Sequence, residues 1–102
     1  MNIRILAEAD AEIKSARRYL EQQTRGLGER FVNDLSDALH SIATRPHSFA
    51  KLETISANHP FQRALLKQFR YVVVFEVVGE DVVVIAVAHA SRAPNYWLKR
   101  RP

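Results

Sequence analysis

The sequence of 102 residues contains no cysteine, which excludes disulfide bonds and thiolate chemistry. A chain without disulfides is typical of a reducing compartment, so we expect a cytoplasmic location. The longest uninterrupted apolar stretch, Val82–Ala88, is far too short to cross a bilayer. The N-terminal residues MNIRILAEADAEIK lack a cleavage-site pattern, so no signal peptide is expected. We therefore expect one domain, since a chain of this length supports a single hydrophobic core.

Acidic residues are also missing from the end of the chain, because none follows Asp81. Acids and bases balance at eight each over residues 1–53, whereas three acids face seven bases over residues 54–102. The net charge of +4 therefore lies entirely in the second half. Such an asymmetry indicates an anionic partner, either a nucleic acid or an acidic protein. The alternative is a solvated basic tail that serves solubility.

Only three glycines are present, and two of them separate two amphipathic stretches. Apolar residues recur at helical spacing over Ala7–Gln23 and again over Glu29–Thr44. Gly26 and Gly28 break the pattern between them, and Pro46 ends the second stretch because the residue before proline avoids helical angles. The sequence therefore predicts two helices that form an antiparallel hairpin.

The remaining apolar residues form runs typical of strands. A short strand is expected at Ile3–Ile5, and longer ones at Phe61–Phe69, Tyr71–Val78 and Val82–His89. Gly79-Glu80-Asp81 has the length of a hairpin loop, residues 51–53 are a further short strand candidate, and residues 56–60 have loop composition. This order predicts an α+β fold in which an N-terminal strand and the helical hairpin pack with a mostly antiparallel, curved sheet.

The last two predicted strands are apolar on both faces, which is unusual for an antiparallel sheet. In YVVVFEVV, Val72 and Val74 point away from Tyr71, Val73 and Phe75. In VVVIAVAH, strict alternation would set residues 82, 84, 86 and 88 against residues 83, 85, 87 and 89. One helical hairpin covers only one face, so the other needs the chain's own termini, a second copy or a different protein. Strong curvature of a small sheet is the alternative explanation.

A set of short motifs occurs in order along nearly the whole chain. LAEADAEIKSARRYL follows the first strand, RFVNDLSDALHSIATRP forms the second helix, and RALLKQFRYVVVFEVVGEDVVVIAVAHASRAPNYWLKR carries the strands and a His-x-x-Arg-x-Pro-x-x-Trp ending. In this order the motifs resemble the RelE/ParE superfamily, the toxins of bacterial type II toxin–antitoxin systems, on the ParE ("plasmid stabilisation") branch. The resemblance implies a RelE-like fold and a small antitoxin as partner. It also implies DNA gyrase as target for ParE-type members, or ribosome-dependent mRNA cleavage for RelE-type members.

Residue chemistry favours the ParE branch over the RelE branch. A metal-free ribonuclease needs a base, cations that hold the phosphate, and an acid. RelE-like nucleases carry an arginine within the strand that corresponds to YVVVFEV, whereas no residue of Val72–Val78 is basic here. We therefore expect a gyrase inhibitor that is not itself an enzyme. The alternatives are a metal-independent endoribonuclease that uses Arg63, His89, Arg92 and Tyr96, and a degenerate, non-toxic domain that only binds its partner.

The expected partner-binding residues combine the basic side chains of the second half with apolar strand and C-terminal residues: Arg63, Lys67, Arg70, Val72, Val74, Trp97, Lys99 and Arg100. The expected partners are a cognate antitoxin and DNA gyrase, or ribosome and mRNA in the alternative, with a homodimer formed directly or through the antitoxin as a further option. Histidine spacing shows no metal-ligand pattern, so neither metal nor cofactor is expected. His89 also has a purely structural interpretation, as a hydrogen-bonded residue that ends its strand.

Overall fold

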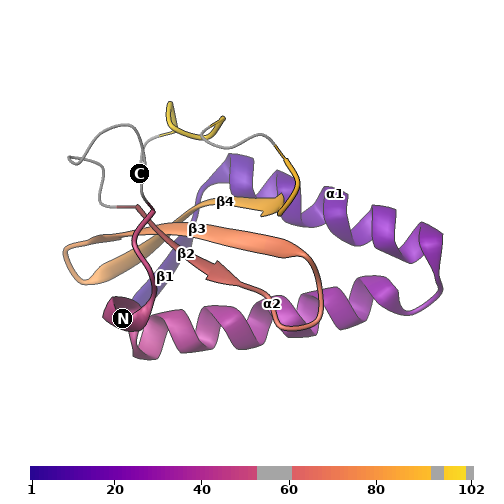
Figure 1. Cartoon of the computed structure of the whole chain (residues 1–102), viewed down its shortest axis with the longest axis horizontal. Coiled ribbons are helices and arrows are strands. Elements are labelled where there is room, and N and C mark those ends of the chain that lie inside the picture. The colour runs from indigo at the N-terminus through magenta and orange to yellow at the C-terminus, as the bar shows by residue number, and fades with distance from the viewer. Residues whose placement is uncertain (53–60, 93–95, 101–102) are drawn as a thin grey trace.

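The computed structural model describes residues 1–52, 61–92 and 96–100 (Figure 1). Three features of the described chain define the fold: a first strand, two long helices and a C-terminal set of strands. In chain order the elements are β1 (Asn2–Ile5), α1 (Ala7–Gln23), α2 (Leu27–Thr44), a single 3-10 turn (Pro46–Ser48), β2 (Phe61–Leu65), β3 (Tyr71–Val78) and β4 (Asp81–His89). The α+β class predicted from the sequence is confirmed.

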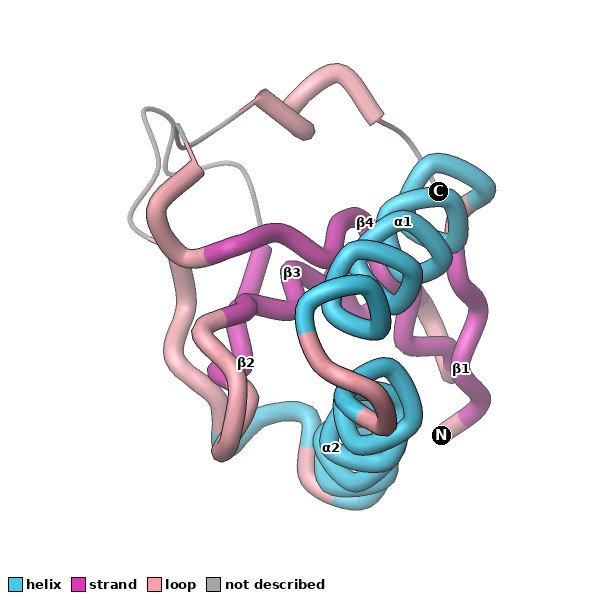
Figure 2. Tube along the Cα trace, turned by 90° about the vertical axis from the view of Figure 1, so that its right-hand side faces the viewer, coloured by secondary structure: helices cyan, strands magenta, loops and turns pink. Residues whose placement is uncertain are grey.

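The two helices form the predicted antiparallel hairpin, and Figure 2, which views them nearly end-on, shows them side by side. The α1 helix has the predicted bounds, whereas α2 begins two residues earlier than expected, at Leu27. The reason is the Glu21 carboxylate, which accepts hydrogen bonds from the backbone N–H groups of Gly26 and Gly28 at 3.0–3.1 Å. These bonds satisfy donors that a helix start leaves unpaired. Gly26 adopts a φ of 90°, which favours glycine.

The four strands form one mixed sheet in the order β1-β4-β3-β2. The β2–β3 and β3–β4 pairs are antiparallel, and β1 joins the outer edge of β4 in parallel. The β3–β4 hairpin matches the prediction closely, but the predicted strand Phe61–Phe69 is shorter, because residues 66–70 turn into β3. Lys51 forms an isolated bridge to Gln62, so only part of the short strand candidate at 51–53 is observed, and residues 53–60 lie outside the described chain.

The helices bury one face of the sheet. Their apolar residues Ala9, Ala16, Phe31, Leu35 and Ile42 form one core with strand residues Ala64, Val73, Phe75, Val82, Val84 and Val87. Phe31 also makes edge-on ring contacts with Phe69 and Tyr71, at centroid distances of 5.7 and 5.0 Å. This core fixes α1 above the C-terminal half of β4, where the candidate site lies.

A β-bulge changes the alternation predicted for β4. Val74 pairs with Ala86 but Phe75 pairs with Val84, so Ile85 is an extra residue without a partner in β3. Ala86 therefore lies on the same side as Ile85, and Val87 turns to the helix side of the sheet. The prediction of strict alternation from residue 82 to 89 is wrong after Ile85, because alternation fails wherever an extra residue enters one strand.

The second face of the sheet is covered in part by the chain's own C-terminal segment. Trp97, with only 4% of its surface exposed, packs on Phe61 at a centroid distance of 5.2 Å and joins a second apolar cluster with Val74 and Ile85. The sequence allowed this face to be covered by the chain's own termini, by a second copy or by a different protein, and over this cluster the chain's own C-terminal segment is observed. The C-terminal segment packs here because the indole of Trp97 removes a large apolar area from water.

Candidate functional site

The candidate site is centred on Glu12, which α1 directs at the bulge of β4. One carboxylate oxygen accepts a hydrogen bond from the Val87 N–H at 3.1 Å and one from Arg100 Nη1 at 2.7 Å. The other accepts from the Tyr96 hydroxyl and faces Arg92 Nη1 at 3.4 Å. Arg100 Nη1 also donates to the carbonyl oxygen of Ile85 at 3.1 Å, which ties the C-terminal segment directly to the bulge.

Two guanidinium groups thus share one carboxylate, and they do so unequally. The side chains of Glu12 and Arg100 are 13% and 17% exposed, whereas that of Arg92 is 54% exposed. Burial lowers the pKa of Arg100, but the hydrogen bond and charge of Glu12 outweigh it, so the pKa stands above its ordinary value. The Arg92 guanidinium lies over the Tyr96 ring, 3.7 Å from its centroid. Arg92 is therefore the loosely held cation of the cluster.

Tyr96 is held in its neutral form by the same cluster. Burial, followed by the hydrogen bond to Glu12 and its negative charge, raises the pKa of Tyr96 to about 12. The phenol therefore keeps its proton throughout the physiological range and donates a hydrogen bond to Glu12. A group held in this way positions the C-terminal segment rather than transferring protons to a ligand near neutral pH.

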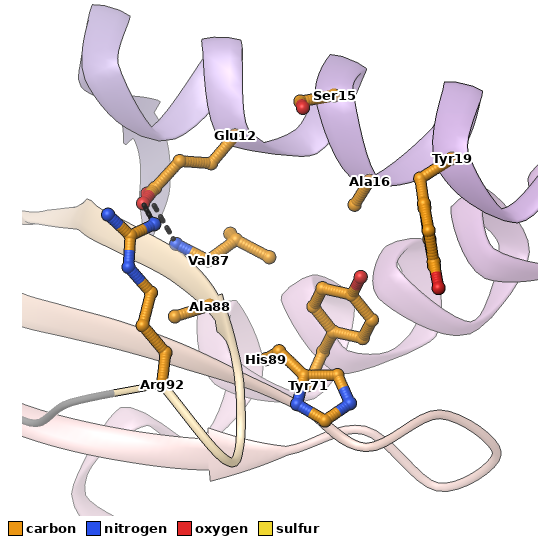
Figure 3. Close-up of a pocket in the computed structure, with 9 residues that line it drawn as sticks. All are labelled: Glu12, Ser15, Ala16, Tyr19, Tyr71, Val87, Ala88, His89 and Arg92. Atoms are coloured by element: carbon orange, nitrogen blue, oxygen red, sulfur yellow. Dashed lines mark hydrogen bonds and ion pairs between the residues drawn. The ribbon is translucent and has the colours of Figure 1, made fainter.

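A hollow of about 290 Å³, here called the helix-side hollow, lies between α1 and the open end of the β3–β4 hairpin, where β3 begins and β4 ends. Figure 3 shows its walls: Tyr19 descends from α1 beside Tyr71, whose hydroxyl points toward α1, while His89 ends β4 and Arg92 lies in the turn that follows. Tyr71 and His89 meet edge-on at a centroid distance of 5.3 Å. Burial, and secondarily Tyr19, raises the pKa of Tyr71, so its hydroxyl remains a hydrogen-bond donor at neutral pH.

A second hollow of about 120 Å³, here called the opposite-face hollow, opens beyond the same end of β4. It brings together the four residues named for a nuclease, Arg63, His89, Arg92 and Tyr96, with Val72 and Trp97 in its wall. His89 is already engaged there, since its Nδ1 lies 2.7 Å from the Ser91 hydroxyl and accepts from the Ser91 N–H at 3.1 Å. His89 and Arg92 line both hollows, because they stand at the strand end that separates them.

The other predicted partner-binding residues are dispersed. Lys67 and Arg70 line a third hollow of about 320 Å³ at the turn between β2 and β3, and Lys99 is exposed. Val74, which is 3% exposed, and Trp97 are buried within the chain, and Arg100 is bound to Glu12. These three therefore stabilise the C-terminal segment, and only the exposed members of the predicted set present a surface to a partner.

Glu12, Tyr19 and Tyr71 were missed as site residues from the sequence. The helical periodicity counts apolar residues and so set Glu12 on another face of the helix, yet its side chain is turned to β4. The spacing held the signal: Glu12 lies three residues after Ala9 and four before Ala16, both of which are buried, and residues so spaced share a helix face. Tyr71 was placed only on the same strand face as Val73 and Phe75, since the sequence does not reveal a hollow above it.

Comparisons with known proteins were made for the whole chain. Residues 3–94 match the family model described as ParE toxin of type II toxin-antitoxin system, parDE. A solved structure described as the chromosomal ParDE TA system from P. aeruginosa shares the fold with a TM-score of 0.74. The two sequences are 11% identical, and the match covers 87% of this chain and 95% of the other. A sequence search of curated proteins gives no match.

Proposed function

Because this chain belongs to the ParE toxin family of type II toxin–antitoxin systems, we propose that it inhibits DNA gyrase by binding it and is neutralised by a cognate antitoxin. The proposal places the protein in the cytoplasm, where gyrase works. It names a binding activity and no catalytic step.

The observation that carries the choice of gyrase is that the Tyr96 hydroxyl, one of the groups named for a nuclease, is committed to Glu12. The Tyr96 hydroxyl donates to that carboxylate, and Arg92 faces it across 3.4 Å. A scissile phosphate would have to displace the carboxylate to use the Tyr96 hydroxyl. The adjoining strand β3 carries no cation, and its single charged residue, Glu76, would repel phosphate. A nuclease site built on these residues would therefore lack the Tyr96 hydroxyl as a free proton donor.

The exposed basic residues support a protein partner with an acidic surface. Arg63, Lys67, Arg70 and Lys99 are all exposed. The apolar Leu65, which shares a hollow with Lys67 and Arg70, is 63% exposed at the edge strand β2. Exposed cations steer association with an oppositely charged partner, while an exposed apolar side chain gains free energy on burial. A homodimer, formed directly or through the antitoxin, stays a prediction.

Purified toxin, free of antitoxin, tests the proposal in a DNA gyrase supercoiling assay. We expect supercoiling to fall as toxin is added and to recover when the cognate antitoxin is present in equal amount. A matched sample of the toxin unfolded by heat serves as the control. If native toxin in large molar excess leaves supercoiling unchanged, gyrase is not the target.

A second candidate, the ribosome-dependent mRNA endonuclease, is favoured by one observation: the opposite-face hollow gathers Arg63, His89, Arg92 and Tyr96. It predicts cleavage at fixed codon positions in translated mRNA, lost in His89→Ala and Arg92→Ala. Intact transcripts after induction would exclude it. Expression in a host without antitoxin separates both candidates from a degenerate, non-toxic domain, because only a working toxin stops growth.

A further inference from the structure

The charge of the Glu12 cluster is unbalanced, which leaves one cation available. Glu12 carries one negative charge, and Arg92 and Arg100 carry two positive ones. The carboxylate is already occupied by Arg100 at 2.7 Å, by the Val87 N–H and by the Tyr96 hydroxyl. Arg92 is therefore a surplus donor at 3.4 Å, and its 54% exposed side chain loses little hydration when it binds an anion.

The helix-side hollow presents further donors beside Arg92. Within the described chain, the hydroxyls of Tyr19 and Tyr71 make no hydrogen bond, and His89 uses only Nδ1, toward Ser91. Because Nδ1 accepts from the Ser91 N–H, the neutral ring carries its hydrogen on Nε2, which makes Nε2 a donor. Figure 3 shows Tyr19 and Tyr71 at one side of this space and the Arg92 guanidinium at the other, turned toward Glu12.

Part of the wall of the hollow is apolar, and the hollow is of modest size. Ala16, Val87 and Ala88 contribute aliphatic wall, and the volume of about 290 Å³ lies at the lower limit of the range that small-ligand sites occupy. Such a space suits a short side chain with an aliphatic stem and an anionic end. We propose that the helix-side hollow binds an acidic side chain of a polypeptide partner, with its stem against Ala88 and its carboxylate on Arg92.

A carboxylate fits better than a phosphate because Glu12 lies in the same wall. Its charge repels a dianion about twice as strongly as a monoanion, and the surplus of one positive charge matches one carboxylate. A polypeptide source follows from the proposed protein-binding function, on which this inference rests. The residues concerned do not include the exposed cations of β2 and its turn, so the hollow adds a contact distinct from that surface.

The test measures binding to the free toxin by NMR, with an acetylated, amidated Ala-Ala-Glu-Ala-Ala peptide as probe. We expect saturable shifts of the Arg92 and His89 side-chain signals and no such shifts with the glutamine version of the peptide. Arg92→Gln should weaken the binding about tenfold or more, because a charge-assisted hydrogen bond is lost.

The control variant is Arg45→Gln, which makes the same charge change at the exposed end of α2 and should leave peptide binding unaltered. Inorganic phosphate is a second probe: tighter binding of phosphate than of the glutamate peptide overturns the carboxylate assignment. Equal binding of the glutamate and glutamine peptides, or equal binding by Arg92→Gln and the unmodified chain, overturns the site itself. Since gyrase is absent from the measurement, failure here leaves the gyrase assay, and hence the proposed function, unaffected.

Discussion

Replacement of Glu12 by glutamine should destabilise the protein by about 2 kcal/mol, because this carboxylate joins the first helix to the C-terminal segment. The variant keeps one acceptor oxygen for the Val87 N–H but sets an amide NH₂ group against the donors of Tyr96 and Arg92. The Arg92 contact adds little to the estimate, because that side chain is 54% exposed and its interaction is screened by water.

The magnitude follows mainly from the Glu12–Arg100 pair. At 13% and 17% exposure, this pair lies between exposed pairs, worth about 0–1 kcal/mol, and buried ones, whose disruption costs about 3–5 kcal/mol. For a chain of this length, a loss of about 2 kcal/mol lowers the melting temperature by roughly 8–16 °C. Calorimetry or circular dichroism melting gives the shift, and urea titration gives the free energy of unfolding.

The same substitution should change the titration of Tyr96. Burial contributes most to its raised pKa and remains in the variant, but the hydrogen bond to Glu12 and its negative charge are removed. The pKa of Tyr96 should therefore fall from about 12 toward its ordinary value without reaching it. NMR of the tyrosine ring carbons against pH measures this change.

The matched control is Glu80→Gln, which removes the same charge in the exposed turn between β3 and β4. It should change the free energy of unfolding by less than about 0.5 kcal/mol. An Arg100→Gln variant and the double variant with Glu12→Gln complete a cycle, with an expected coupling of about 1–2 kcal/mol. Our reasoning is refuted if Glu12→Gln melts with the control and Tyr96 titrates as in the unmodified chain.

Three further predictions concern residues away from this carboxylate. Trp97→Ala should lower the free energy of unfolding by about 3–5 kcal/mol, because removal of the buried indole leaves a cavity between the sheet and the C-terminal segment. Thermal melting measures this loss, and a loss below about 1 kcal/mol would contradict the packing of Trp97. Gly28→Ala should destabilise, although alanine ordinarily favours helices, because its Cβ would lie 2.9 Å from the Arg17 carbonyl oxygen; denaturant titration gives the sign. The N–H groups of Gly26 and Gly28 lower the pKa of Glu21 in the folded protein. The contribution of Glu21 to stability is therefore present above its pKa in the unfolded chain and is lost as pH falls through its pKa in the folded protein. Glu21→Gln should make the free energy of unfolding less dependent on pH on the acid side, as measured by denaturant titration at several pH values.

Local patterns in the sequence were sufficient for the type and order of the helices and main strands, although not for every boundary. The helical spacing over Ala7–Gln23 and the run Tyr71–Val78 predicted those elements with the observed bounds, because apolar periodicity reflects which side of an element is buried. The hairpin turn at Gly79 was equally local, since its φ of 61° favours glycine. The ordered motifs likewise led to the ParE family, which the family match confirms.

Tertiary structure alone decided how the faces of the sheet are used. A bulge at Ile85 depends on the pairing of two strands, so no pattern within one strand predicts it. The cover of the second face by Trp97, and the meeting of Glu12 with Arg100 across 88 positions in the chain, depend on where the C-terminal segment returns. Composition gave the surplus of positive charge in the second half, but only the folded chain determines which of those cations are neutralised internally and which remain available to a partner. The physical reason is that ion pairs and buried faces depend on distances in space, which the sequence of one chain specifies only through its fold.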